Sequence, residues 1–172
     1  MKQVGVLALQ GAFIEHEKML EQLGVSCIEL RNKEDLEKPY DGIILPCGES
    51  TVQGQLLRKL DMLATIKSLI ADGLPTLATC AGLILLAGHI DNDDSVHIGT
   101  LPVTVKRNAY GRQLGSFVRT APMKGFDEFP MIFIRAPYIS SLKDNVDVLA
   151  AVNDRIVAVQ YNNQIGLAFH PE

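Results

Sequence analysis

The sequence lacks the features that mark several large classes of protein. Its three cysteines are an odd number without a C-x-x-C pair, so neither a disulfide framework nor a zinc knuckle is expected. The apolar run near the N-terminus, Val4 to Leu9, is too short for a signal-peptide core or a membrane span. A formal net charge of −4 argues against a nucleic-acid surface. These absences predict a cytoplasmic chain with neither a membrane nor a nucleic-acid partner.

What the sequence does contain is the alternation of an α/β protein. Its 172 residues, 47% of them hydrophobic, predict a single domain over 1–172 whose core needs no disulfide or metal. Apolar runs of strand length alternate with helical segments through the first half, which predicts a mostly parallel sheet. The strands expected there are 4–9, 25–30, 42–46 and 75–78, and the expected helices are one ending at Gly24, then 52–60, 62–72 and 83–87.

Short strands separated by turns dominate the second half of the chain. They are expected at 98–105, 116–119, 131–137, 146–152, 155–161 and 164–169. Residues 107–113 have the composition of an ordered turn, so the segments on either side of it are expected to pair as antiparallel strands. The sequence therefore predicts antiparallel strands added to the parallel sheet.

Cys80 stands at the junction between an expected strand and an expected helix. Unpaired N–H groups at a helix start lower the pKa of a thiol and can hold a developing oxyanion. Small residues follow it, Ala81 and Gly82, and they leave room for a substrate carbonyl. Although most cysteines are merely buried apolar residues, this placement favours a nucleophile.

A second loop follows the strand that ends at Pro46. In a parallel sheet, the carboxyl ends of neighbouring strands converge on one crevice, so this loop, 47–51, can face Cys80. Gly48 lets a backbone N–H approach a ligand closely. Ser50 or Thr51 is the expected N-cap of the helix that follows.

The chain ends in His170-Pro171-Glu172, which offers a base and a carboxylate. Residues two apart in extended chain point the same way, so His170 and Glu172 can lie on one face. With Cys80 they complete a nucleophile, base and orienting acid, and the backbone N–H groups of Ala81, Cys47 and Gly48 are the expected oxyanion hole. The predicted chemistry is acyl transfer through a thioester.

Two other polar features stand outside this set. Arg135 follows four apolar residues, and such a guanidinium either pairs with an internal carboxylate or binds an anionic ligand. The polar segment 89–97 offers metal-ligating side chains, but the sixth and twelfth positions of a calcium loop starting at Asp91 are Val96 and Pro102. A solvated loop is expected there, and no metal or cofactor is expected anywhere in the chain.

The motifs resemble those of class I glutamine amidotransferases. Thr79-Cys80-Ala81-Gly82, Gly48-Glu49-Ser50-Thr51 and His170-Pro171-Glu172 match the nucleophile, oxyanion and His-x-Glu motifs of that family. Gln10-Gly11-Ala12, the segment from Arg107 to Gln113, and Phe133 to Pro137 are similar to the glutaminase subunits of pyridoxal 5′-phosphate synthases, in order along nearly the whole chain.

The resemblance implies a three-layer αβα, flavodoxin-like fold with a mostly parallel central sheet and additional antiparallel strands. It implies hydrolysis of L-glutamine to glutamate and ammonia, with ammonia channelled to a synthase subunit. Gln10 is implied to lie near the site and the synthase interface. The residues implied to contact glutamine are Gly48, Glu49, Ser50, Arg107, Ile134 and Arg135.

The chain departs from the family pattern at three places. Cys47 and Ala78 replace glycines, and a side chain at 47 hinders a peptide rearrangement that glycine permits. We therefore hypothesise weakened or more tightly gated activity, and a Cys47–Cys80 disulfide under oxidation. Relatives also continue into a terminal helix beyond the position of Glu172, so either the sequence is shortened or one flank of the sheet is bare.

Two further functions stay open at this point. One is a weak or inactive subunit that still binds the synthase, which Cys47 favours and the complete triad opposes. The other is a glutaminase of another pathway or a γ-glutamyl hydrolase, which the motifs around Arg107 and Arg135 oppose.

Overall fold

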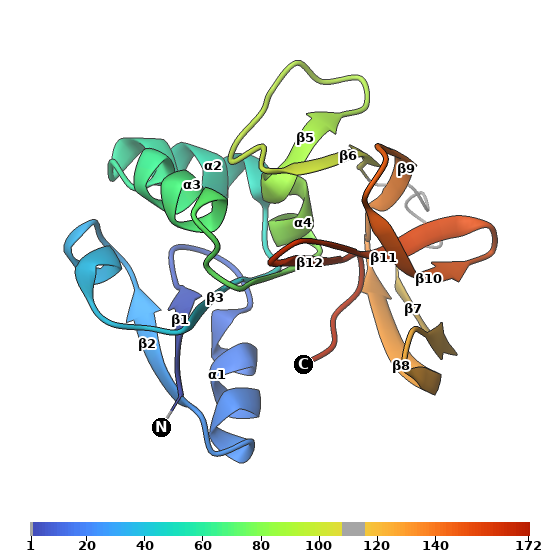
Figure 1. The fold of residues 1–172 in the computed structure, drawn as a ribbon, viewed down its shortest axis with the longest axis horizontal. Helices are drawn as coiled ribbons and strands as arrows, with labels where there is room; N and C mark the ends of the chain where they lie inside the picture. The colour runs from blue at the N-terminus through green and yellow to red at the C-terminus, as the bar shows by residue number, and fades with distance from the viewer. Residues whose placement is uncertain (1, 108–115) are drawn as a thin grey trace.

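The chain forms a large mixed sheet with helices on both faces and a separate two-stranded sheet beside it (Figure 1). This computed structural model describes residues 2–107 and 116–172. The elements of the first half are β1 (Gln3–Leu7), α1 (Phe13–Gln22), β2 (Ser26–Leu30), the 3-10 helix η1 (Glu34–Glu37), β3 (Gly42–Leu45), α2 (Ser50–Lys59), α3 (Leu63–Ala71), β4 (Thr76–Thr79) and α4 (Ala81–Leu86). Those of the second half are β5 (Ala87–Ile90), β6 (Leu101–Lys106), β7 (Ser116–Met123), β8 (Phe126–Ile134), β9 (Tyr138–Leu142), β10 (Asp147–Val152), β11 (Arg155–Tyr161) and β12 (Gln164–Leu167).

The large sheet has a parallel half and a second half in which most strands pair antiparallel, apart from the parallel pair of β5 and β6. Its order is β2-β1-β3-β4-β12-β11-β9-β6-β5, with β10 paired to β11. The first five strands pair in parallel, in the flavodoxin-like order 2-1-3-4-5 with β12 in fifth place. The strands β11, β10 and β9 then join in antiparallel pairs. The expected mixed α/β sheet is therefore confirmed.

Alternation along the central strands sends side chains to the two helical layers. Val6 and Ile44 pack with Leu20 of α1 on one face. Leu7 and Leu45, which point the other way, join the large core under α2, α3 and α4 on the opposite face (Figure 1). Each such aliphatic side chain contributes about 1.5–3 kcal/mol when fully buried. None of the helices in the described part of the chain is long and apolar enough to cross a membrane.

The pairing expected across residues 107–113 is wrong. β6 pairs with β5 and β9, whereas β7 pairs with β8, so 98–105 and 116–119 are not partners. Met123 and Phe126 face each other across a two-residue turn that contains Gly125 at φ 92°. Such a short hairpin closes at a small entropy cost, which favours it over a longer loop. Most of the expected turn, residues 108–113, lies outside the described residues.

Candidate active site

Three adjacent parallel strands bring Cys47, Cys80 and His170 together. In the register, Leu45 of β3 lies beside Ala78 of β4, and Leu167 of β12 lies beside Thr79. The three strands therefore end at the same edge of the sheet, and each is followed within three residues by one of these side chains. The two sulfur atoms and a ring nitrogen of His170 all lie within 4.8 Å of one another.

Cys80 occupies a strained turn at the start of α4. Its φ of 51° and ψ of −104° are unusual for a residue with a side chain, and its N–H donates to Leu167 O at 2.8 Å. Only 6% of the residue is exposed. Gly82 packs so closely on β3 that a Cβ there would collide with the carbonyl oxygen of Leu45. The strand, turn and helix expected around Cys80 are confirmed.

His170 and Glu172 lie on one face, as the sequence predicts. His170 Nδ1 is 2.9 Å from Glu172 Oε1, and the His170 N–H donates to Ile132 O of β8 at 2.8 Å. The second oxygen, Glu172 Oε2, lies 3.7 Å from His16 Nε2 of α1, and that nitrogen is 3.3 Å from Thr79 Oγ1. Glu172 is therefore held between two histidines from opposite ends of the sequence.

The thiol pair and His170 perturb one another strongly. Burial opposes a charge on His170, but the nearby Cys47 sulfur and the hydrogen bond with Glu172 prevail and raise its pKa to about 10. Contact with Cys80, assisted by His170 and the Ala81 amide, lowers the pKa of Cys47 to about 5. The same contact with Cys47, followed by burial, raises the pKa of Cys80. A single negative charge on the thiol pair is therefore favoured beside the His170 imidazolium.

Gln10 supports the loop that follows β3. Its Oε1 accepts a hydrogen bond from the Glu49 N–H at 2.8 Å, and its carbonyl oxygen accepts one from Gln53 Nε2 at 3.0 Å. Gly48 lies against both side chains, and a Cβ there would collide with Gln10 Oε1. The carbonyl oxygen of Cys47 accepts a hydrogen bond from the Ala12 N–H at 2.8 Å. The expected oxyanion loop is thus anchored to the loop after β1.

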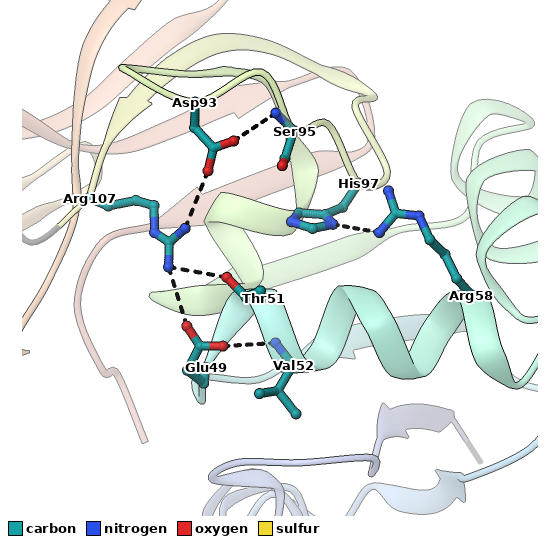
Figure 2. A network of polar contacts seen from close by, with 8 residues as sticks. All are labelled: Glu49, Thr51, Val52, Arg58, Asp93, Ser95, His97 and Arg107. Carbon is teal, nitrogen blue, oxygen red and sulfur yellow. Dashed lines mark hydrogen bonds and ion pairs between the residues drawn. The ribbon is translucent and has the colours of Figure 1, made fainter.

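The N-cap expected at Ser50 or Thr51 is wrong. Glu49 caps α2, and its Oε2 accepts a hydrogen bond from the Val52 N–H at 2.7 Å (Figure 2). The backbone of Glu49 is extended, at φ −110° and ψ 111°, and its side chain, which is longer than that of serine or threonine, reaches back to the first turn of the helix. Ser50, one residue further on, is instead buried at the start of the helix.

Arg107 links three parts of the chain at the pocket rim (Figure 2). It lies 3.2 Å from Glu49 Oε1 and 3.6 Å from Asp93 Oδ2, and it donates to Thr51 Oγ1 at 3.4 Å. Asp93 Oδ1 accepts a hydrogen bond from the Ser95 N–H at 2.8 Å, which shapes the polar loop. Arg107 therefore holds the segment 89–97 through its contact with Asp93. Residues 87–90 form β5, a strand that the sequence did not predict.

Arg135 also lines the pocket, is exposed and has φ 46°. Among residues 2–107 and 116–172 it has no carboxylate partner, so of the two alternatives the structure lacks the internal ion pair. Its neighbour Ile134 offers a carbonyl oxygen 4.0 Å from Cys80 Sγ. Both residues line the same pocket as the thiols.

The pocket has a volume of about 390 Å³, within the ordinary range for small-molecule sites. Every residue expected to touch glutamine lines it, together with Cys80 and His170, the expected nucleophile and base. The lining residues are Cys47, Gly48, Glu49, Ser50, Cys80, Ala81, Ile84, Arg107, Ile134, Arg135 and His170. Gln10 and Glu172 lie behind it and support its walls.

His16 is the residue at this site that the sequence did not indicate. It is 3% exposed, and burial, only partly offset by Glu172, lowers its pKa. In the sequence, His16 stands out only as a polar residue four positions before Leu20, on the same face of α1. A single histidine on an apolar face has too many structural explanations to identify a function.

A cysteine at a strand-to-helix turn, a histidine with its carboxylate, and an adjoining loop with backbone N–H groups form the arrangement expected of a class I glutamine amidotransferase. The fold agrees, since a crystal structure of a glutamine amidotransferase matches with a TM-score of 0.92 at 40% identity, over 98% of this chain and 89% of that one. The model of the SNO glutamine amidotransferase family matches residues 6–172, and the chain belongs to this family.

Curated relatives align along almost the whole chain. A pyridoxal 5′-phosphate synthase subunit PdxT of Desulfitobacterium hafniense is 60% identical over 99% of this chain and 85% of the relative. A subunit of the same name from Haemophilus influenzae is 53% identical over 99% of this chain and 90% of the relative.

Proposed function

We propose that this chain is the glutaminase subunit of a pyridoxal 5′-phosphate synthase, hydrolysing L-glutamine to L-glutamate and ammonia for a synthase partner. The observation that carries the proposal is the grouping of Cys80, His170 and Glu172 at one pocket, in a chain of the SNO family. The names of the relatives support the pyridoxal pathway over a γ-glutamyl hydrolase or another pathway's glutaminase.

In this proposal Cys80 Sγ attacks the side-chain amide carbon of glutamine. The attacking sulfur is the thiolate, whose proton already resides on His170, and the imidazolium gives that proton to the leaving nitrogen, which departs as ammonia. Water, activated by His170, then cleaves the thioester and releases glutamate. Glu172 keeps the proton on Nδ1, which directs Nε2 of His170 toward the sulfur. The backbone N–H groups of Ala81, Cys47 and Gly48 are the proposed oxyanion donors.

The pocket rim supplies the proposed substrate contacts. Arg107 and Arg135 are the cations on the pocket lining that suit the α-carboxylate of glutamine. Glu49, already paired with Arg107, is placed to accept from the α-ammonium group. Ser50, Gly48 and the Ile134 backbone complete the lining around the substrate.

His16 is a positioning residue in this proposal. It contacts the oxygen of Glu172 that does not bind His170, and so fixes the carboxylate from behind. Because His16 belongs to α1, a movement of that helix would be passed to His170 through His16 and Glu172.

A second function has one observation in its favour. Contact with Cys47, followed by burial, raises the pKa of Cys80, which lowers the share of reactive Cys80 thiolate at rest. A synthase-binding subunit with weak glutaminase activity is consistent with that arrangement.

Glutamate release from glutamine, measured with and without the partner synthase subunit, tests the proposal. We expect activity that is highest in the complex and lost in Cys80→Ala. Isotopically labelled amide nitrogen should then appear in the pyridoxal ring. Complex formation without glutamate release would favour the weak or inactive subunit, and release that never depends on the synthase would contradict the assigned partner.

A further inference from the structure

Two thiols and one imidazole converge at the carboxyl ends of β3, β4 and β12. Cys47 is 8% exposed and Cys80 is 6% exposed, and the His170 side chain is 12% exposed. The two sulfurs and the ring nitrogen lie within 4.8 Å of one another. The ligands come from positions 33 and 90 residues apart along the chain, so no local spacing motif signals them.

This set of donor atoms suits a soft divalent cation. Zn²⁺ binds thiolate sulfur at about 2.3 Å and imidazole nitrogen at about 2.0–2.1 Å in tetrahedral geometry, which places neighbouring ligand atoms about 3.5–4 Å apart. The spacing here exceeds that geometry by about 1.3 Å at most, so binding needs only a small movement of the ligating side chains.

The histidine is already oriented as in a metal site. Its Nδ1 binds Glu172 at 2.9 Å, while Nε2 is buried and has no hydrogen-bond partner in the described part of the chain. A carboxylate behind a ligating imidazole fixes its tautomer and raises its basicity, as outer-shell partners of metal-binding histidines commonly do. His16 holds the other oxygen of the same carboxylate.

We propose that Cys47, Cys80 and His170 form a binding site for a soft divalent cation, best filled by Zn²⁺, with the fourth coordination position facing the pocket. The ion replaces the protons that remain on a thiol and on the imidazole, and these pass to solvent. The site depends on Cys47, because a glycine at this position would leave only one sulfur and one nitrogen as ligands.

Occupation of the site blocks the nucleophile and the base together. This inhibitory consequence rests on the proposed glutaminase function, whereas the metal site itself does not. Zn²⁺ would therefore act as a reversible inhibitor that a chelator removes.

The test uses the full, reduced, metal-free chain titrated with Zn²⁺ by calorimetry and with Co²⁺ by absorption spectroscopy. We expect one ion per chain and a thiolate-to-cobalt charge-transfer band. Cys47→Gly should weaken Zn²⁺ binding by more than the roughly 10- to 100-fold that loss of an outer-shell partner costs. Cys27→Ser, which removes the exposed thiol, is the matched control and should bind as the parent does.

A measurement without variants keeps the proposal testable if Cys47→Gly folds poorly. Zn²⁺ should protect the peptides that contain Cys47 and Cys80 from alkylation and leave Cys27 reactive, as read by mass spectrometry. Protection of neither buried thiol, a cobalt spectrum without a thiolate band, or equal Zn²⁺ affinity in a folded Cys47→Gly chain would overturn the site. None of these readouts depends on glutaminase activity, so the two proposals fail separately.

Discussion

Cys47 is the side chain that most changes the chemistry of this site. Its sulfur lies within 4.8 Å of both Cys80 Sγ and a ring nitrogen of His170, and the two thiols shift each other's pKa in opposite directions. The sequence identified the position as unusual but could not show that the sulfur points at the nucleophile. Both thiols are free in the structure, and the hypothesis that oxidation joins them stays a prediction.

Cys47→Gly should make Cys80 the thiolate of the site. Without the second sulfur, His170 stabilises only the Cys80 anion, and the alkylation rate of Cys80 at pH 7 should rise at least about 10-fold. Iodoacetamide labelling followed by peptide mass spectrometry gives that rate across pH. A rate unchanged from the parent would show that Cys47 does not hold the charge, and Cys27→Ser supplies the control for general thiol exposure.

His16→Phe should impair catalysis more than substrate binding. Phenylalanine fills similar space but loses the 3.7 Å contact with Glu172, so kcat should fall about 10-fold with KM little changed, a size within the coupling of about 0.5–3 kcal/mol between residues in contact. His16→Gln, which retains an N–H donor, should restore much of the rate. A purely structural role would instead lower the melting temperature in both variants and leave the pH profile of kcat unmoved.

At the scale of elements, the loop after β1 and the loop after β3 act as one unit. The hydrogen bonds of Gln10 and Ala12 to the second loop hold its carbonyl and amide groups in place. Gly11 makes this approach possible, because it has φ 102° and lies against the Cys47 carbonyl.

Gly11→Ala should cost more stability than Gly24→Ala, a change at another glycine with positive φ. Both Gly11 and Gly24 have positive φ, which costs alanine about 1–2 kcal/mol. Only at Gly11 does the new Cβ meet backbone, which adds about 1–3 kcal/mol. Urea unfolding of Gly11→Ala and Gly24→Ala measures the difference, and equal destabilisation would refute the close packing of the two loops.

At the scale of the whole molecule, overall stability should depend on a carboxylate pair between α1 and β2. Burial, with Glu29 adding to it, raises the pKa of Glu17 from 4.5 to about 7, and Arg31 opposes this only in part. The folded chain thus holds a proton that the unfolded chain loses near pH 4.5. This group therefore lowers stability as the pH rises from 4.5 through 7.

Glu17→Gln should remove that decline. The variant should match the parent near pH 4.5 and exceed it at pH 8, by about 1 kcal/mol at most since solvent screens the pair. Urea unfolding at several pH values measures both curves. Glu21→Gln removes one charge from the same helix as a control, and an equal gain there would assign the effect to net charge instead.

The sequence by itself determined the α/β class, the turn at Cys80, and the pairing of His170 with Glu172. These depend on contacts between neighbours in the chain: alternating apolar residues, small residues after a strand, and a spacing of two in extended chain. The same local reasoning failed where two local structures competed, as when the hairpin of β7 with β8 replaced the pairing across residues 107–113.

Only the tertiary structure decided which distant residues share the site. The approach of Cys47 to Cys80, the contact of His16 with Glu172, and the position of Arg107 between Glu49 and Asp93 all follow from strand order. Strand order is set by how apolar faces are buried across the whole sheet, a sum over many weak and nonlocal contacts that no short stretch of sequence encodes.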